Sequence, residues 1–146
     1  MAKPTIDFPS LQKIPLSYAT CSIGTDVSDT LPRKLEAIAG AGFNGIEINY
    51  TDIVAYASSI LGHQISEENY VELVTAAAQI RKLCEANSLK ILMLQPFANW
   101  EGWRRGSPER EDALRRASGW IEVMKAVGTD MLQVRMPHNF HFLFLK

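Results

Sequence analysis

The chain has 146 residues, of which 47% are hydrophobic, and its formal net charge is −1 at pH 7. This length suits one domain with a substantial buried core. The 15 basic and 16 acidic residues are interspersed, so nothing in the charge pattern points to nucleic acid or an anionic membrane as a partner.

The sequence also indicates a cellular compartment. It contains no apolar run near the roughly 20 residues of a membrane-spanning helix, and residues 1–15 lack the basic-then-apolar order of a signal peptide. Two cysteines, Cys21 and Cys84, are too few for a disulfide scaffold. We expect a cytoplasmic protein in which both are small core residues.

Strand and helix candidates alternate along the chain after an extended, proline-containing leader over residues 1–15. The strand candidates are 16–24, 45–50, 90–94 and 131–135. The helix candidates between them are 29–42, 51–62, 66–87 and 107–128. Such alternation predicts parallel strands joined by crossover helices.

The two long helices carry recognisable caps and apolar stripes. Ser66 and Ser107 are the expected N-caps, and Asn87 and Gly128 the expected ends. Helical spacing predicts two buried stripes. Their residues are Leu73, Ala77, Ile80 and Cys84 in the first helix, and Leu114, Ala117, Ile121, Met124 and Val127 in the second.

Three strands share a design with one aliphatic face and one face that becomes polar toward the carboxyl end. The aliphatic residues are Ile46 and Ile48, Leu92 and Leu94, and Leu132 and Val134; the opposite ones are Glu47 and Asn49, Met93 and Gln95, and Gln133 and Arg135. The aliphatic face suits covering helices, and the other suits the inside of a barrel with a ligand pocket at its rim. Pro96 is expected to end the third strand.

The polar face supplies the candidate substrate-binding residues: Glu47, Asn49, Gln95 and Arg135. Glu47 is interpreted either as a group that holds a substrate hydroxyl or assists proton transfer, or as a buried partner of Arg135. Gln95 and Asn49 are either substrate donors or satisfied polar groups at strand ends. Arg135 also suits bidentate binding of a substrate carboxylate.

Other motifs point to packing or turns. Residues 40–45 match GxGxxG, but the predicted order is helix then strand, the reverse of a dinucleotide site, so these glycines form a helix stop and a tight turn. Trp100 and Trp103 belong to a rim loop, and Trp120 is expected to pack in the core. His138 and His141 have ligand-like spacing but no partners.

The segment "AGFNGIEI" resembles the helix-to-strand hinge of xylose isomerase-like TIM barrels, the sugar phosphate isomerase/epimerase superfamily. The segments "GIEINYTDIVAYA", "IRKLCEANSLKILMLQPF" and "GTDMLQV" are most similar to the 3-dehydroshikimate dehydratase branch. The resemblance covers about residues 16–136 and implies an α/β fold: the N-terminal half of a (β/α) barrel with about four strands. Residues 137–146 form an atypical tail.

This resemblance implies a divalent metal (Mg, Mn or Co) at the barrel mouth, which polarises a carbonyl during proton abstraction from a small polyhydroxy or carbocyclic acid. A complete barrel needs eight strands and about 250 residues. The strands expected to carry the metal ligands are therefore missing, no metal ligand or catalytic residue is assigned, and enzymatic activity is left open. We expect a truncated form that is inactive alone.

Two alternatives stand beside this expectation. One is a non-enzymatic half-barrel module that self-associates through its open edges or docks on a full-length paralogue. The other is a small independent α/β enzyme that uses Glu47, Gln95 and Arg135 without metal.

Overall fold

The computed structural model describes residues 14–135. Its strands alternate with helices, except that one short 3-10 turn follows the first strand and two helices follow the second strand. In chain order they are β1 (Ser17–Ala19), η1 (Thr20–Ser22), α2 (Leu31–Gly40), β2 (Gly45–Asn49), α3 (Tyr50–Leu61), α4 (Tyr70–Ala86), β3 (Lys90–Ala98), α5 (Pro108–Val127) and β4 (Leu132–Arg135).

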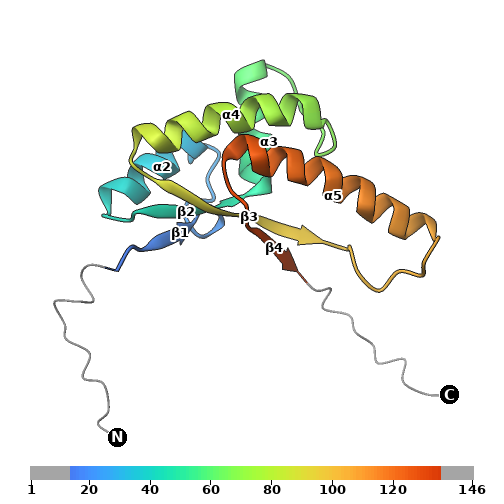
Figure 1. The fold of residues 1–146 in the computed structure, drawn as a ribbon. Helices are drawn as coiled ribbons and strands as arrows, with labels where there is room; N and C mark the ends of the chain where they lie inside the picture. Colours follow the sequence, from blue (N-terminus) through green and yellow to red (C-terminus); the bar gives the residue numbers. More distant parts are fainter. Residues whose placement is uncertain (1–13, 136–146) are drawn as a thin grey trace, which may run out of the picture.

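The four strands form one parallel sheet in the order β1-β2-β3-β4. All the helices lie on one side of this sheet (Figure 1). This arrangement of β/α units in sequential order confirms the predicted partial TIM-barrel fold. Among the described residues, no helix is both long and apolar enough to cross a membrane.

The core lies between the sheet and the helices. Ile46 and Ile48 of β2, Leu94 of β3, and Leu73 and Ile80 of α4 are all fully buried there. Burying one aliphatic side chain of this size is worth about 1.5–3 kcal/mol. The predicted stripe of α4 is confirmed, because Ala77 and Cys84 are buried with it.

Trp120 of α5 closes the core at the carboxyl end of the sheet. Its ring stacks on Tyr50 with 3.9 Å between centroids and meets Phe97 edge-on at 5.1 Å. Burial raises the pKa of the Tyr50 hydroxyl above its ordinary value, and this hydroxyl donates a 2.7 Å hydrogen bond to the Glu67 carbonyl. The predicted packing role of Trp120 is confirmed.

The prediction for Leu92 is wrong. The register shifts between β2 and β3: Ile46 pairs with Ile91 and Glu47 with Met93, which leaves Leu92 as an extra residue. Ile91 takes the buried position. Gly45 and Ile46 are consecutive residues of β2 and face opposite sides of the sheet. A Cβ built on Gly45 would lie 3.5 Å from Leu92 Cγ. Leu92 therefore lies on the face opposite to the helices, because a bulge reverses the alternation.

The beginning of the chain also differs from expectation. The first strand covers only Ser17–Ala19, and the chain then turns through η1. Cys21 is consequently exposed, whereas Cys84 is buried as predicted. Burial raises the pKa of the Cys84 thiol to about 12. The expected leader lies outside the described residues except for Ile14 and Pro15, and the tail 137–146 lies outside them completely.

Two further predicted boundaries, at the starts and ends of later elements, are wrong. Asn69, not Ser66, caps α4, because its side chain accepts from the Glu72 amide while Ser66 accepts from Glu68 in the preceding turn. Pro96 does not end β3, which continues to Ala98 through a cis Gln95–Pro96 bond. Ser107 does cap α5.

The predicted stripe of α5 is only half correct. Met124 and Val127 are buried, but Leu114 is 51% exposed and Ile121 is 44% exposed. The buried side of the helix is instead centred on Trp120 and Val123. Leu114 and Ile121 lie away from this buried side, on a more exposed flank of α5.

We expect thiol reagents to distinguish the two cysteines. At pH 8 the native chain should react through Cys21 alone, because thiolate is the reactive species and the Cys84 thiol is both buried and protonated. Ellman's reagent should count one thiol in the native state and two in denaturant. The variant Cys21→Ser should leave almost no fast-reacting thiol, and rapid labelling of Cys84 would contradict the described packing.

Truncating Trp120 should destabilise the fold far more than truncating a rim tryptophan. Trp120→Ala removes the contacts with Tyr50 and Phe97 and should lower the free energy of unfolding by about 3–5 kcal/mol. Trp103→Ala, at a position 44% exposed, should lower it by less than about 1 kcal/mol. Chemical denaturation of both variants would measure the difference, and equal losses would refute it.

Candidate functional site

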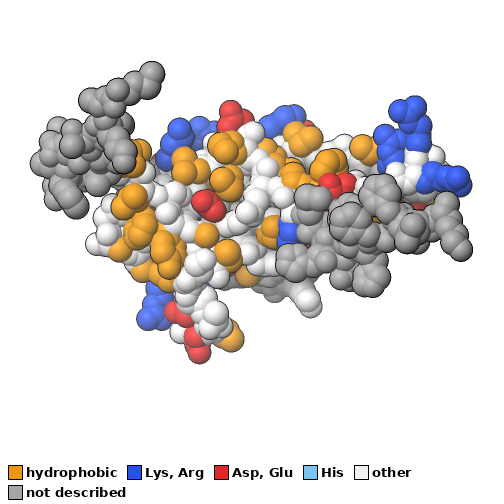
Figure 2. All heavy atoms as spheres, turned by 90° about the horizontal axis from the view of Figure 1, so that it is seen from below, with side chains coloured by type: hydrophobic (Ala, Val, Ile, Leu, Met, Phe, Trp, Pro, Cys, Tyr) orange, Lys and Arg blue, Asp and Glu red, His pale blue; other side chains and the backbone are white. Residues whose placement is uncertain are grey.

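The sheet face away from the helices carries the candidate polar residues. Asn49 pairs with Gln95 across β2 and β3, and Glu47 pairs with Ala19 and Met93. Figure 2 views the molecule from this side and shows hydrophobic side chains with isolated acidic groups among them. Within residues 14–135, no helix covers this face (Figure 1).

Gln95 is the most deeply placed member of the set. It is only 6% exposed, and its Nε2 contacts Cys21 Sγ at 3.8 Å. Sulfur is a weak acceptor, and no other side-chain hydrogen bond of Gln95 occurs within the described residues. A buried amide so weakly satisfied retains most of its capacity to bind a ligand.

Glu47 and Arg135 do not form the ion pair that one interpretation predicts. Glu47 lies opposite Met93, whereas Arg135 lies opposite Ala98. Five residues along a strand correspond to roughly 15 Å, too far for a salt bridge. The Glu47 side chain is half-buried, and it forms no hydrogen bond or ion pair with any of the residues 14–135.

Asn49 has a structural task. Its side-chain oxygen accepts from the Thr51 amide at 3.0 Å and from the Thr51 hydroxyl at 2.9 Å, which caps α3. The backbone amide of Asn49 donates to Oγ1 of the buried Thr20. These contacts favour the interpretation of Asn49 as a satisfied polar group at a strand end.

Arg135 is exposed at the end of β4. Its partner Ala98 follows the helix-facing Phe97, so Arg135 belongs to the same polar face as Gln95. The structure thus brings Glu47, Gln95 and Arg135 onto one face at three successive heights, rather than around one point.

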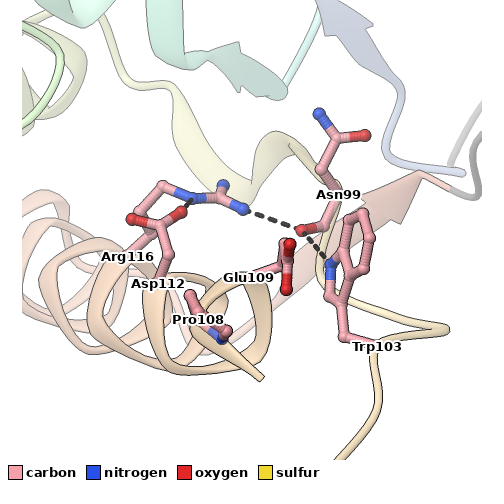
Figure 3. Close-up of a pocket in the computed structure, with 6 residues that line it drawn as sticks. All are labelled: Asn99, Trp103, Pro108, Glu109, Asp112 and Arg116. Atoms are coloured by element: carbon pink, nitrogen blue, oxygen red, sulfur yellow. Dashed lines mark hydrogen bonds and ion pairs between the residues drawn. The ribbon is translucent and has the colours of Figure 1, made fainter.

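A rim pocket of about 580 Å³ lies between the β3–α5 loop and the start of α5. It is lined by Asn99, Trp103, Pro108, Glu109, Asp112 and Arg116 (Figure 3). Arg116 donates to the carbonyls of Ala98 (3.2 Å) and Asn99 (2.8 Å) and pairs with Asp112 at 2.9 Å. The guanidinium therefore ties the end of β3 to α5.

Trp103 belongs to this clamped loop. Its indole Nε1 donates to the same Asn99 carbonyl at 3.3 Å, as Figure 3 shows. The neighbouring Trp100 is 45% exposed. Both rings cover the rim, and neither contacts Glu47 or Gln95 by any hydrogen bond within the described residues.

Sequence reasoning missed a buried ion pair at the carboxyl ends of β1 and β2. Lys34 Nζ lies 2.9 Å from Asp52 Oδ1 and donates to the Thr20 carbonyl at 3.3 Å. Asp52 Oδ2 is buried without a hydrogen-bond partner among the described residues. The available signal was the position of Lys34 inside the apolar stripe of α2, between Leu31 and Leu35.

The described residues do not fit a resident metal. No three His, Cys, Asp or Glu side chains within residues 14–135 lie close enough together to hold one. Oxygen-binding divalent cations take six or more ligands, and Glu47 has no acidic neighbour on its face. His138 and His141 lie outside the described residues.

Comparison with known proteins places this architecture in a family. Residues 35–142 match the model of the xylose isomerase-like TIM barrel. The chain is 38% identical over 118 residues to a 3-dehydroshikimate dehydratase of Pseudomonas aeruginosa, covering 81% of this chain and 15% of that protein. It is 35% identical over 128 residues to the 3-dehydroshikimate dehydratase of Neurospora crassa, covering 86% of this chain and 35% of that protein.

A solved structure agrees with these relatives. A fusion of a xylose isomerase-like TIM barrel with 4-hydroxyphenylpyruvate dioxygenase superimposes with a TM-score of 0.58 at 35% identity, over 81% of this chain and 15% of that one. The chain thus spans about a third or less of the length of each of these proteins.

Removing one partner of the buried Lys34–Asp52 ion pair should destabilise the fold. Lys34→Met leaves a buried carboxylate without its partner and should lower the free energy of unfolding by about 3–5 kcal/mol. Lys34→Met combined with Asp52→Leu should recover most of this loss. Lys125→Met, which breaks an exposed pair with Glu122, should change it by less than about 1 kcal/mol.

Urea denaturation of the four proteins measures these differences. A double variant as unstable as Lys34→Met would show that the pair itself, rather than the uncompensated carboxylate, stabilises the fold.

Proposed function

The chain belongs to the xylose isomerase-like TIM barrel family, and we propose that it supplies the first four β/α units of a dehydratase-like barrel. The substrate on this proposal is a small polyhydroxy or carbocyclic acid of the 3-dehydroshikimate type. The reaction is proton abstraction next to a carbonyl, followed by loss of water.

The observation that carries this proposal is the weakly satisfied Gln95 amide on the sheet face that no helix covers within residues 14–135. Its position at the carboxyl end of a parallel strand is the place where barrels of this kind bind substrate. The identity to two 3-dehydroshikimate dehydratases, 38% and 35%, supports this substrate class.

Each polar residue has a proposed task. The Gln95 amide orients a substrate hydroxyl or carbonyl, and Glu47, which has no ion-pair partner within residues 14–135, accepts a proton or a hydroxyl hydrogen bond. Arg135 binds the carboxylate by a two-pronged hydrogen bond. Asn49 caps α3 through its side-chain oxygen, so on this proposal it can bind substrate only through its side-chain NH2 group.

The family's divalent metal would polarise the substrate carbonyl. Because the described residues do not fit such an ion, we expect no turnover from this chain alone. On this proposal, the described residues form a substrate-binding part of the barrel.

A second candidate function is that of an interaction module without catalysis. The observation that favours it is the exposure of Leu114 and Ile121 on α5, since apolar flanks of this kind mark contact surfaces.

A chimera tests the catalytic proposal. Residues 16–135 of this chain would replace the matching segment of the Neurospora crassa dehydratase, and loss of water from 3-dehydroshikimate would be followed with added manganese or magnesium. We expect turnover, and a decrease in kcat/KM of about tenfold or more for Glu47→Gln and for Gln95→Ala, because each removes a hydrogen bond to the reacting ligand.

The exposed substitution Glu36→Gln on α2 is the matched control and should leave kcat/KM unchanged. A folded chimera whose kcat/KM is insensitive to both Glu47→Gln and Gln95→Ala would contradict the assigned roles. Turnover by the chain alone would contradict its expected inactivity.

A further inference from the structure

Cys21 is held at the carboxyl end of the sheet by the residue before it. Thr20 is fully buried. Its Oγ1 accepts a hydrogen bond from the backbone amide of Asn49 at 3.0 Å, and its carbonyl accepts from Lys34 Nζ at 3.3 Å. These two contacts fix η1 against the end of β2 and the first turn of α2. The fold therefore sets the position of Cys21, although Cys21 itself is exposed.

The Cys21 sulfur lies against the most deeply placed group of the candidate substrate site. Its Sγ is 3.8 Å from Gln95 Nε2, across 74 positions of sequence. Within residues 14–135 this is the only side-chain hydrogen bond of Gln95, and Gln95 Oε1 has no partner there. A side chain that is 6% exposed and carries an unpartnered oxygen retains the capacity to bind a ligand.

The two cysteines differ in access. Cys84 is buried in the core beneath the helices, whereas Cys21 is open to reagents in solution. The second polar neighbour of the Cys21 sulfur in the described part of the chain is Ser22 Oγ, at 4.0 Å. A reachable thiol thus lies beside a buried amide that has little else to bind.

We propose that Cys21 is a modification site that controls ligand binding at Gln95, through exchange with a low-molecular-weight disulfide such as glutathione disulfide. The Cys21 thiolate attacks one sulfur of that disulfide. A new S–S bond forms at Cys21, the original S–S bond breaks, and the departing thiolate takes up a proton in place of the one that Cys21 lost. Cys21 is thereby oxidised, one half of the disulfide is reduced to a thiol, and a dithiol reverses the step.

The geometry explains why the attached group blocks the site. An S–S bond is about 2 Å long. With Sγ at its observed position, the second sulfur lies at most about 6 Å from Gln95 Nε2. The tripeptide that follows is bulkier than a small polyhydroxy acid and competes for the space beside the amide. Its net negative charge also repels a substrate carboxylate.

This inference rests on the proposed binding of substrate at Gln95 and adds a regulation of that same site. It requires ligand binding by the chain but not turnover. If the contact between Cys21 and Gln95 served packing alone, ligand and disulfide would not compete.

Competition between ligand and disulfide tests the contact in the full chain. Glutathione disulfide is added with and without saturating 3-dehydroshikimate, and the adduct on Cys21 is followed by mass spectrometry. We expect the ligand to slow modification of Cys21 by about tenfold or more, as for competition at one site. Equal rates with and without ligand would overturn the proposal.

The matched control carries Cys21→Ser together with Val71→Cys. Val71 is 80% exposed on α4, in the helical layer on the other side of the sheet from Gln95 (Figure 1). The ligand should leave the rate at this introduced thiol unchanged. Equal protection at both positions would show a general effect of the ligand on the chain and would refute a contact specific to Cys21.

The converse measurement is ligand binding by the modified chain. Isothermal titration should show an affinity for 3-dehydroshikimate that is lower by about tenfold or more after modification, and dithiothreitol should restore it. Cys21→Ser keeps an oxygen that can accept from Gln95 and should show no response to glutathione disulfide. Equal affinities of the modified and unmodified chains, or a response in Cys21→Ser, would contradict the proposal.

The outcomes separate this inference from the catalytic one. A chimera without turnover, together with protection of Cys21 in the full chain, would refute the dehydratase assignment and support the control by Cys21. A chimera whose turnover is unaffected by glutathione disulfide would refute the control by Cys21 and leave the catalytic proposal in place.

Discussion

Burial of one aliphatic sheet face beneath a single layer of helices is the constraint on which the rest of this structure depends. Ile46, Ile48 and Leu94 point into that layer and are fully buried. Because side chains alternate along a strand, this burial sends Glu47 and Gln95 to the other face. The separation of a packing face from a polar face is therefore a direct consequence of where the apolar residues go.

The strand registers decide how the polar residues can act together. Glu47 pairs with Met93 and Arg135 pairs with Ala98, so that Gln95 lies above Glu47 and Arg135 lies higher still. A staggered arrangement cannot form a compact ion-pair cluster, but it can follow an extended ligand from a hydroxyl to a carboxylate. The clamp from Arg116 to the end of β3 holds the upper part of this face in place.

The same one-sided construction links both candidate functions. The face that carries the proposed substrate-binding residues has no covering layer within residues 14–135. Among the same residues, Leu114 and Ile121 on α5 are about half exposed. Each β/α unit of a barrel uses its two flanks to contact its neighbours.

The sequence by itself determined the element types, their alternation, the parallel sheet and the division of each strand into an aliphatic and a polar side, because these depend on local periodicity and caps. The family resemblance also followed from short sequence segments. Only the tertiary structure decided the rotation of α5, the reversed position of Leu92, the exposure of Cys21 and the Lys34–Asp52 pair. These features depend on how α5 packs, on strand register and on contacts between residues distant along the chain. Local patterns do not contain this information, apart from the position of Lys34 within the apolar stripe of α2, which indicated its burial but not its partner.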